Sequence, residues 1–274
     1  MSWQCKVAPS LGGGFAGTVE SAWGTLPYEK TYAPTVFFGM YGLPDFFAFR
    51  QHKGDKTILW AGSDITHLKN GYWLDDKGKH RVPPQVLARY LNEYTNYVEN
   101  IVEHDELKKL GIESHIVPSF LGDWRDYELF YTPSEKPKVY ASVSGDDFEI
   151  YKWKEIEELA VKHPDIEFHL YGNNRTWSSF CQNIVVHGRV SQEEMNREIK
   201  EMQGSLRLLD HDGCSEIVVK AMLWGQWVFS IIPYPTSLSP DKLGTLKDLA
   251  YPNVEGRNWF INNLNKYPWV SKKQ

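Results

Sequence analysis

Residues 206–229 constrain the fold more strongly than any other segment of this chain. Their pattern predicts a buried strand from Leu206 to Leu209, a polar turn from Asp210 to Ser215, a helix from Glu216 to Trp224, and a second apolar strand after Gly225. Two strands joined through a helix form the connection that parallel sheets require. The segment therefore predicts an α/β fold.

The turn in this segment is also a candidate anion site. Asp212, Gly213 and Ser215 lie where the predicted helix begins. Free backbone N–H groups and the positive end of the helix dipole attract anions at such a position. A diphosphate with a hydroxyl-rich group at each end would suit the turn, but Asp, Gly and Ser also form ordinary helix caps.

Length, charge and cysteine content narrow the class of protein. The 274 residues allow one large domain or two of ordinary size. The net charge of -5 argues against a chain that binds nucleic acid through an overall positive charge. A local basic groove remains an alternative. Cys5, Cys181 and Cys214 are too scattered for a disulfide framework or a zinc site and favour a reducing cytoplasm. Because we find neither a signal-peptide pattern nor an apolar run of about 20 residues, we expect a cytoplasmic protein without an integral membrane segment.

Strand-like and helix-like segments alternate in two blocks, which a proline-containing linker at residues 132–137 separates. This order predicts two Rossmann-like domains, residues 1–133 and 134–274. The terminal helix predicted at residues 258–267 is a candidate to pack back on the first domain. We expect strands at residues 35–41, 56–61, 97–102 and 112–117 in the first domain, and at 138–143, 166–171 and 183–187 in the second.

Loops that follow strands are the places to search for a site, because ligands of parallel sheets bind beyond the carboxyl ends of the strands. The loops in question are residues 62–66, 144–147, 172–174, 187–190 and 210–215. Asp146 and Asp147 in the second of these loops are interpreted as a solvated turn rather than a metal site or a catalytic pair.

The ordered features together resemble the retaining glycosyltransferases of the two-domain GT-B type, family 4-like group. The resemblance covers residues 136–232, with Phe168-His-Leu-Tyr-Gly172 and Ile184-Val-Val-His-Gly-Arg-Val190 before the acid-turn-helix segment. In the first domain, Trp60-Ala-Gly-Ser-Asp64 and residues 104–118 are similar to further pieces of the family pattern. The resemblance implies two Rossmann-like domains with a cleft between them. The chain departs from the family pattern in its N-terminal domain, which we expect to be shortened.

The resemblance also implies a hexosyl- or pentosyltransferase that uses a nucleotide sugar, a UDP- or GDP-sugar, as substrate without a metal or other cofactor. Its acceptor would be a hydroxyl group of a saccharide, a lipid-linked glycan or a modified DNA base. The compact first domain and the many aromatic residues favour the DNA base, and the acidic net charge argues against it.

Site residues follow from the same resemblance. Asp212 would contact hydroxyl groups of the donor sugar, while the backbone of the turn would meet the sugar and the diphosphate. His211 is either a ligand of the phosphate or sugar or a structural hydrogen-bonding residue. The implied set is Asp212, Lys152, Arg189 and Asp64 for catalysis, and His211, Gly213, Cys214, Ser215, Glu216, Lys220, Tyr171, Gly172 and Gly188 for donor binding.

Three positions leave alternatives open. The family pattern places a ribose-binding acid where this chain has Lys220, and an ammonium cannot accept hydrogen bonds from ribose hydroxyls. Either Glu216 one turn earlier binds the ribose, or the donor is unusual, or the chain is a catalytically silent nucleotide-binding protein. Asp64 either faces the acceptor or caps a helix over residues 65–69, and residues 11–17 form either an acceptor-facing glycine loop or a surface turn.

Overall fold

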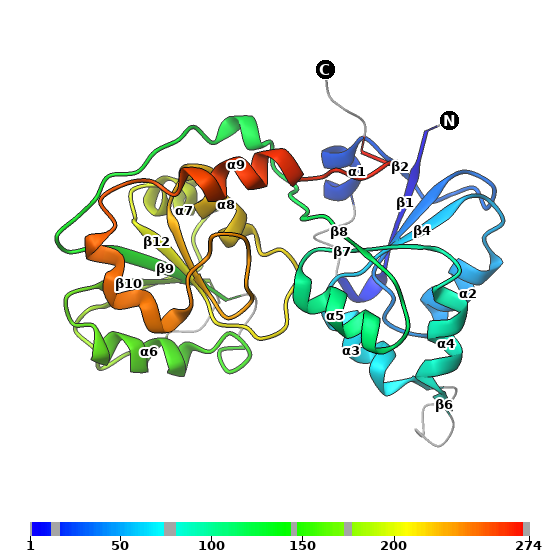
Figure 1. Cartoon of the computed structure of the whole chain (residues 1–274), viewed down its shortest axis with the longest axis horizontal. Helices are drawn as coiled ribbons and strands as arrows, with labels where there is room; N and C mark the ends of the chain where they lie inside the picture. Colours follow the sequence, from blue (N-terminus) through cyan, green and yellow to red (C-terminus); the bar gives the residue numbers. More distant parts are fainter. Residues whose placement is uncertain (1, 12–16, 74–80, 144–146, 173–176, 271–274) are drawn as a thin grey trace. The chain divides into compact units, whose positions relative to one another are not determined.

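The computed structural model describes residues 2–11, 17–73, 81–143, 147–172 and 177–270. The chain divides into two compact units (Figure 1). The first unit consists of residues 1–123, 211–214 and 263–274, and the second of residues 124–210 and 215–262. Among the described residues, no helix combines the length and apolar character needed to cross a bilayer.

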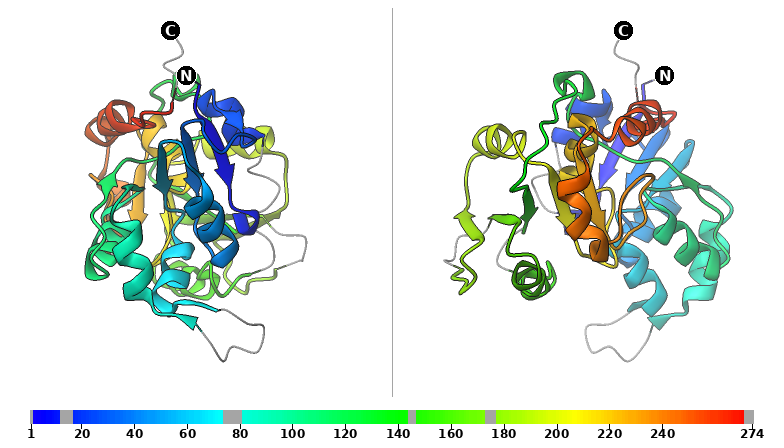
Figure 2. Two further views of the ribbon diagram at one scale, coloured as in Figure 1. Left: turned by 90° about the vertical axis from the view of Figure 1, so that its right-hand side faces the viewer. Right: turned by 60° about the vertical axis from the view of Figure 1, so that its left-hand side comes forward.

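The main sheet of the first unit is parallel, with the strand order β2-β1-β3-β4-β7-β8. All four residues of β3 are buried, as expected for a strand that helices cover on both faces. The left view of Figure 2 turns this unit toward the viewer. The strands are β1 (Gln4–Val7), β2 (Leu26–Pro27), β3 (Thr35–Phe38), β4 (Lys56–Leu59), β7 (Thr95–Val98) and β8 (His115–Ile116), and β5 (Tyr72–Trp73) pairs separately with β6 (Arg81–Val82).

Short helices connect these strands: η1 (Pro9–Leu11), α1 (Thr18–Trp23), α2 (Leu43–Gln51), α3 (Ser63–Asn70), α4 (Pro84–Leu91) and α5 (Ile101–Lys109). Helix α5 begins at Ile101, inside the segment 97–102 that the sequence predicts as a strand. The side chain of Asn100 accepts hydrogen bonds from the backbone N–H groups of Val102 and Glu103 and so caps the helix. The strand therefore ends at Val98, and Glu99 and Asn100 form its carboxyl-end turn.

The sheet of the second unit is also parallel, with the order β11-β10-β9-β12-β13. Its core includes Val139, Phe168, Leu206 and Phe229, and the right view of Figure 2 brings this unit forward. The strands are β9 (Lys138–Ser142), β10 (Glu167–Tyr171), β11 (Ile184–Gly188), β12 (Gly204–Arg207) and β13 (Trp227–Ser230). The helices are η2 (Trp124–Asp126), α6 (Trp153–Lys162), α7 (Gln192–Ile199), α8 (Glu216–Trp224), η3 (Pro240–Asp248) and α9 (Val254–Asn263).

Helix α8 has the bounds that the sequence predicted. Residues 217–224 are all buried, which explains why the segment is apolar except at Lys220. The helix ends at Gly225, whose φ of 80° lies in the left-handed region that favours glycine.

After α9 the chain returns to the first unit. Asn265 pairs there with Phe120 through two hydrogen bonds, accepting from its N–H at 2.9 Å and donating to its carbonyl at 2.7 Å. Tyr267 donates to the carbonyl of Val117 at 2.5 Å and stacks on Trp269 with a ring separation of 4.4 Å. These aromatic side chains are buried and pack against Trp23 and Tyr97, so the last described residues complete a core layer of the first unit.

Candidate functional site

The strand order of the second unit defines where a ligand can bind. From β9 the chain proceeds outward through β10 and β11 in one direction and later through β12 and β13 in the other. The crevice at the carboxyl ends of β9 and β12 is therefore the switch point at which open α/β sheets bind ligands. The loops from β9 to α6 and from β12 to α8 border this position.

Lys152 lies at the start of α6, at the end of the loop that follows β9. Its φ and ψ of 59° and 37° place it in the left-handed region, which costs a non-glycine residue about 1 kcal/mol or more. Its ammonium lies 3.9 Å from Glu155, and the side chain is one-third exposed. A partly exposed cation next to the switch point can bind an anion there.

Arg207, the last residue of β12, is a charged residue that the sequence interpretation overlooked. Its guanidinium is buried, donates to the carbonyl of Ser142 at the end of β9 at 3.4 Å, and lies 4.9 Å from the ring centre of Tyr151. The guanidinium thus connects the two strands that flank the switch point. We had interpreted residues 206–209 as a plain buried strand, although an arginine in such a strand is itself unusual.

Two glycines bring the loops after β10 and β11 together. The N–H of Gly172 donates to the carbonyl of Gly188 at 2.7 Å. A Cβ on Gly172, whose φ is 98°, would lie 2.1 Å from the carbonyl oxygen of Val143, so only glycine fits. Arg189 follows directly and is exposed.

The side chain of Tyr171 is buried, and both its hydroxyl group and its ring have partners within the second unit. Its hydroxyl donates to Glu198 at 2.7 Å, and its ring stacks on His187 with 4.2 Å between centres. Burial raises the pKa of Tyr171, so its hydroxyl stays protonated. Only the backbone of Tyr171 is available for a ligand.

Lys220 pairs with Glu216 on the same face of α8. The ammonium lies 3.1 Å from the Glu216 carboxylate, four residues earlier, and is almost fully buried, whereas Glu216 is partly exposed. The lysine that replaces the expected acid therefore holds another acid in place near the start of the helix. Ser215 is the N-cap residue of α8 and forms no capping hydrogen bond through its side chain.

Residues 211–214 belong to the first unit, where they contact the turn after β7 and helix α5. The amide of Asn100 donates to the carbonyl of Asp212 at 2.7 Å, and the N–H of Cys214 donates to Glu99 at 2.6 Å. His211 lies 2.6 Å from Glu106. A Cβ on Gly213 would come within 2.2 Å of the Glu99 carboxylate, so a larger residue here would have to displace that side chain.

Three buried carboxyl groups surround this contact: Asp64, Glu99 and Glu103. Burial raises the pKa of Glu99 to about 7, against the opposing effect of hydrogen bonds from Ser119 and Cys214. Burial raises the pKa of Glu103 well above its ordinary value, and repulsion from the neighbouring Glu99 carboxylate adds to this effect. We therefore expect Glu103 to be protonated at neutral pH.

Asp64 is fully buried, and its two oxygens accept hydrogen bonds from the backbone of Met40 at 2.8 Å and of Ala61 at 3.0 Å. Burial raises its pKa to about 7, although these hydrogen bonds oppose the shift. The carboxyl group thus fastens the loops after β3 and β4 to each other. This geometry gives Asp64 a positioning function in the first unit.

The predicted site residues thus fall into two groups. Lys152, Gly172, Gly188, Arg189 and the start of α8 lie at the carboxyl edge of the second sheet, whereas Asp64 and residues 211–214 lie at that edge of the first. In the described part of the chain, no group of three or more His, Cys, Asp or Glu residues is arranged to hold a metal ion. Residues 12–16 of the predicted glycine loop, together with Asp146, lie outside the described residues.

Several solved structures share this architecture. TarM, a protein of S. aureus, is similar with a TM-score of 0.57 and 15% identity, over 85% of this chain and 52% of the TarM chain. Sucrose-phosphate synthase from Thermosynechococcus elongatus is similar with a TM-score of 0.59 and 12% identity, over 84% of this chain and 69% of the synthase chain. The UDP-forming α,α-trehalose-phosphate synthase of Burkholderia vietnamiensis has a TM-score of 0.50 and 10% identity, over 86% of this chain and 68% of the synthase chain.

These structures are GT-B glycosyltransferases, and the chain has the GT-B fold with its two Rossmann-like domains. The predicted fold class is therefore confirmed. The chain spans about half the length of TarM. No family model matches the sequence, and no curated protein does.

Proposed function

We propose that this protein is a glycosyltransferase that moves a sugar from a nucleotide-sugar donor to a hydroxyl group. The observation that carries the proposal is the set of polar groups at the switch point of the second sheet. Lys152 and Arg207 border it with positive charge, and Glu216 presents a carboxylate at the start of α8. A nucleoside diphosphate sugar combines an anionic centre with hydroxyl groups, and these residues match both.

The leaving diphosphate is the group that most needs stabilisation in such a reaction. Its charge grows as the bond to the sugar breaks, and cations already in place stabilise it without reorganisation. In this proposal Lys152, Arg207 and the exposed Arg189 supply that charge, and no step requires a metal ion.

Glu216 takes the place of the acid that the family pattern has at position 220. A carboxylate accepts hydrogen bonds from two ribose hydroxyls, which Lys220 cannot do. Lys220 instead fixes Glu216 through the 3.1 Å ion pair. The departure from the family pattern then relocates the ribose contact by one helical turn rather than abolishing it.

The remaining assignments are proposals from the resemblance. Asp212 contacts hydroxyls of the donor sugar, the donor is a UDP-sugar, the acceptor is a saccharide, and the anomeric configuration is retained. UDP appears in the names of two similar structures, TarM in complex with UDP and the UDP-forming trehalose-phosphate synthase. For this chain UDP is the first donor nucleotide to test.

The experiment is a panel of UDP-, GDP-, ADP- and TDP-sugars scored for nucleoside diphosphate release, with and without saccharide acceptors. One donor should be consumed, and Lys152→Ala should lower kcat about 100-fold, as removal of a charge-stabilising group does. Lys162→Ala, at the far end of the same helix, is the matched control and should have no effect.

Proton NMR of the product reports whether the anomeric configuration is retained. If calorimetry detects nucleotide binding but no donor is consumed, the protein is a silent binding protein and the proposal is wrong. If Lys152→Ala and Lys162→Ala behave alike, the assignment of Lys152 is wrong even if transfer occurs.

A further inference from the structure

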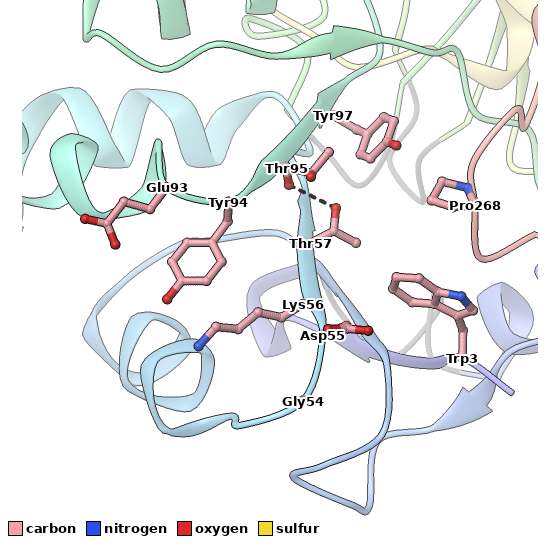
Figure 3. A pocket seen from close by; sticks show the side chains of 10 residues that line it. All are labelled: Trp3, Gly54, Asp55, Lys56, Thr57, Glu93, Tyr94, Thr95, Tyr97 and Pro268. Atoms are coloured by element: carbon pink, nitrogen blue, oxygen red, sulfur yellow. Dashed lines mark hydrogen bonds between the residues drawn. The ribbon is translucent and has the colours of Figure 1, made fainter. Parts of the chain in front are cut away.

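A second pocket lies in the first unit, at the amino ends of β4 and β7 (Figure 3). It has a volume of about 480 Å³, which is within the range of small-molecule sites. In parallel sheets the reacting ligand binds at the carboxyl ends, and Asp64 and Glu99 lie at that opposite edge. The pocket is therefore separate from the candidate active site.

Four distant segments of the chain form its walls: Trp3, residues 54–57, residues 93–97 and Pro268. The wall at Tyr97 is rigid, because the ring packs edge-on against Trp269 at 5.1 Å and Tyr267 at 5.5 Å. Trp3 also packs against Trp269, with 6.0 Å between ring centres. The aromatic surface is thus held in place by a buried layer behind it.

The charges of the pocket exclude two classes of ligand. Asp55 and Glu93 are exposed, and neither forms a salt bridge within the described part of the chain. Two carboxylates repel a phosphate or another anion. Lys56 lies 4.8 Å from the ring centre of Tyr94, so that ring already binds a cation and a second one would be repelled.

The ammonium group of Lys56 also forms hydrogen bonds within the first unit. It donates to the carbonyls of Phe49 at 2.8 Å and His52 at 2.9 Å. Figure 3 shows this side chain directed toward Tyr94 and away from Trp3. Figure 3 also shows Glu93 pointing away from Trp3 and Asp55, so Trp3, Tyr97 and Asp55 are left to contact one ligand together.

We propose that this pocket binds a neutral saccharide. A sugar offers a hydroxyl donor to Asp55, and an apolar C–H face that packs on the ring of Trp3 or Tyr97. It carries no net charge, so neither the acids nor Lys56 oppose it. The site does not depend on the proposed transferase activity.

The test is saturation-transfer NMR and calorimetry on the full chain with maltose and N,N′-diacetylchitobiose. Each is titrated to about 50 mM, because an open pocket of this kind binds weakly. At least one saccharide should bind, and Asp55→Asn should weaken binding about tenfold by removing a hydrogen-bonded charge. Glu93→Gln, at the acid that points away from Trp3, should change the affinity little. Both substituted side chains are exposed, so the variants should fold normally.

Trp3→Ala should abolish the saturation transfer, and Trp124→Ala, at an exposed tryptophan of the second unit, is the matched control. The proposal is overturned if neither saccharide binds, if UDP displaces the saccharide, or if tetramethylammonium competes with it. Nucleoside diphosphate release should stay unchanged in Asp55→Asn and Glu93→Gln, which separates failure of this site from failure of the transferase assignment.

Discussion

Gly172 and Gly188 form a matched pair for measuring how tightly the loops of the second sheet are packed. Both have a positive φ, 98° and 68°, so alanine is strained at either position. A Cβ at Gly188 would meet no atom within 4 Å, whereas at Gly172 it would lie 2.1 Å from the carbonyl oxygen of Val143. Gly188→Ala should therefore cost only the conformational strain, about 1–2 kcal/mol.

Gly172→Ala has at least as much conformational strain, because its φ of 98° lies further from the left-handed minimum, and it must also displace a backbone carbonyl at the end of the neighbouring strand. The total should reach about 3–5 kcal/mol, the range of severe packing defects. Urea unfolding measures both values, as a lower midpoint with an unchanged slope. Equal losses of stability in the two variants would refute the reasoning, because both the contact with Val143 and the larger φ make alanine worse at position 172.

Three further predictions concern charged and polar groups. The raised pKa of Glu99, about 7, means that the folded chain binds a proton that the unfolded chain releases near pH 4.5. Stability should therefore fall as pH rises from about 5 to 7, and Glu99→Gln should make this slope shallower in thermal unfolding, with Asp64 and Glu103 accounting for what remains. Lys220→Met should lower kcat/KM for the donor about tenfold, mainly by raising KM, because Glu216 loses its ion pair. Lys247→Met, at an exposed lysine, is the control. An unchanged KM in Lys220→Met would contradict the ribose contact proposed for Glu216. Tyr171→Phe should cost about 1 kcal/mol in urea unfolding by removing the hydrogen bond to Glu198, and a stabilised variant would show that this bond is not formed.

The elements that the sequence predicted best are those with strong local signals. Helix α8 was predicted from end to end because a polar turn precedes it and Gly225 ends it. Strand β1 and helix α1 were not predicted, because β1 is a four-residue segment with lysine and glutamine among its residues. Its place between β2 and β3 arises from long-range pairing, which no local pattern encodes.

The candidate site shows the same limit. The sequence indicated which loops carry polar residues, since strand ends are recognisable, but not how those side chains are used. Asp64 lies where it was expected and yet is fully buried beneath two backbone N–H groups. The ion pair between Lys220 and Glu216 depends on both residues sharing one face of α8, and their spacing of four residues already allowed it.

The return of residues 263–270 to the first unit has a consequence for how the protein is made. During synthesis the N-terminal sheet emerges first, but Asn265, Tyr267 and Trp269 leave the ribosome only after the whole second unit. Trp23 and Tyr97 must wait for these partners with their apolar surfaces uncovered. Nascent chains halted before residue 263 should therefore recruit chaperones through this surface, and the chaperones should dissociate once residues 263–270 have emerged rather than on completion of either sheet.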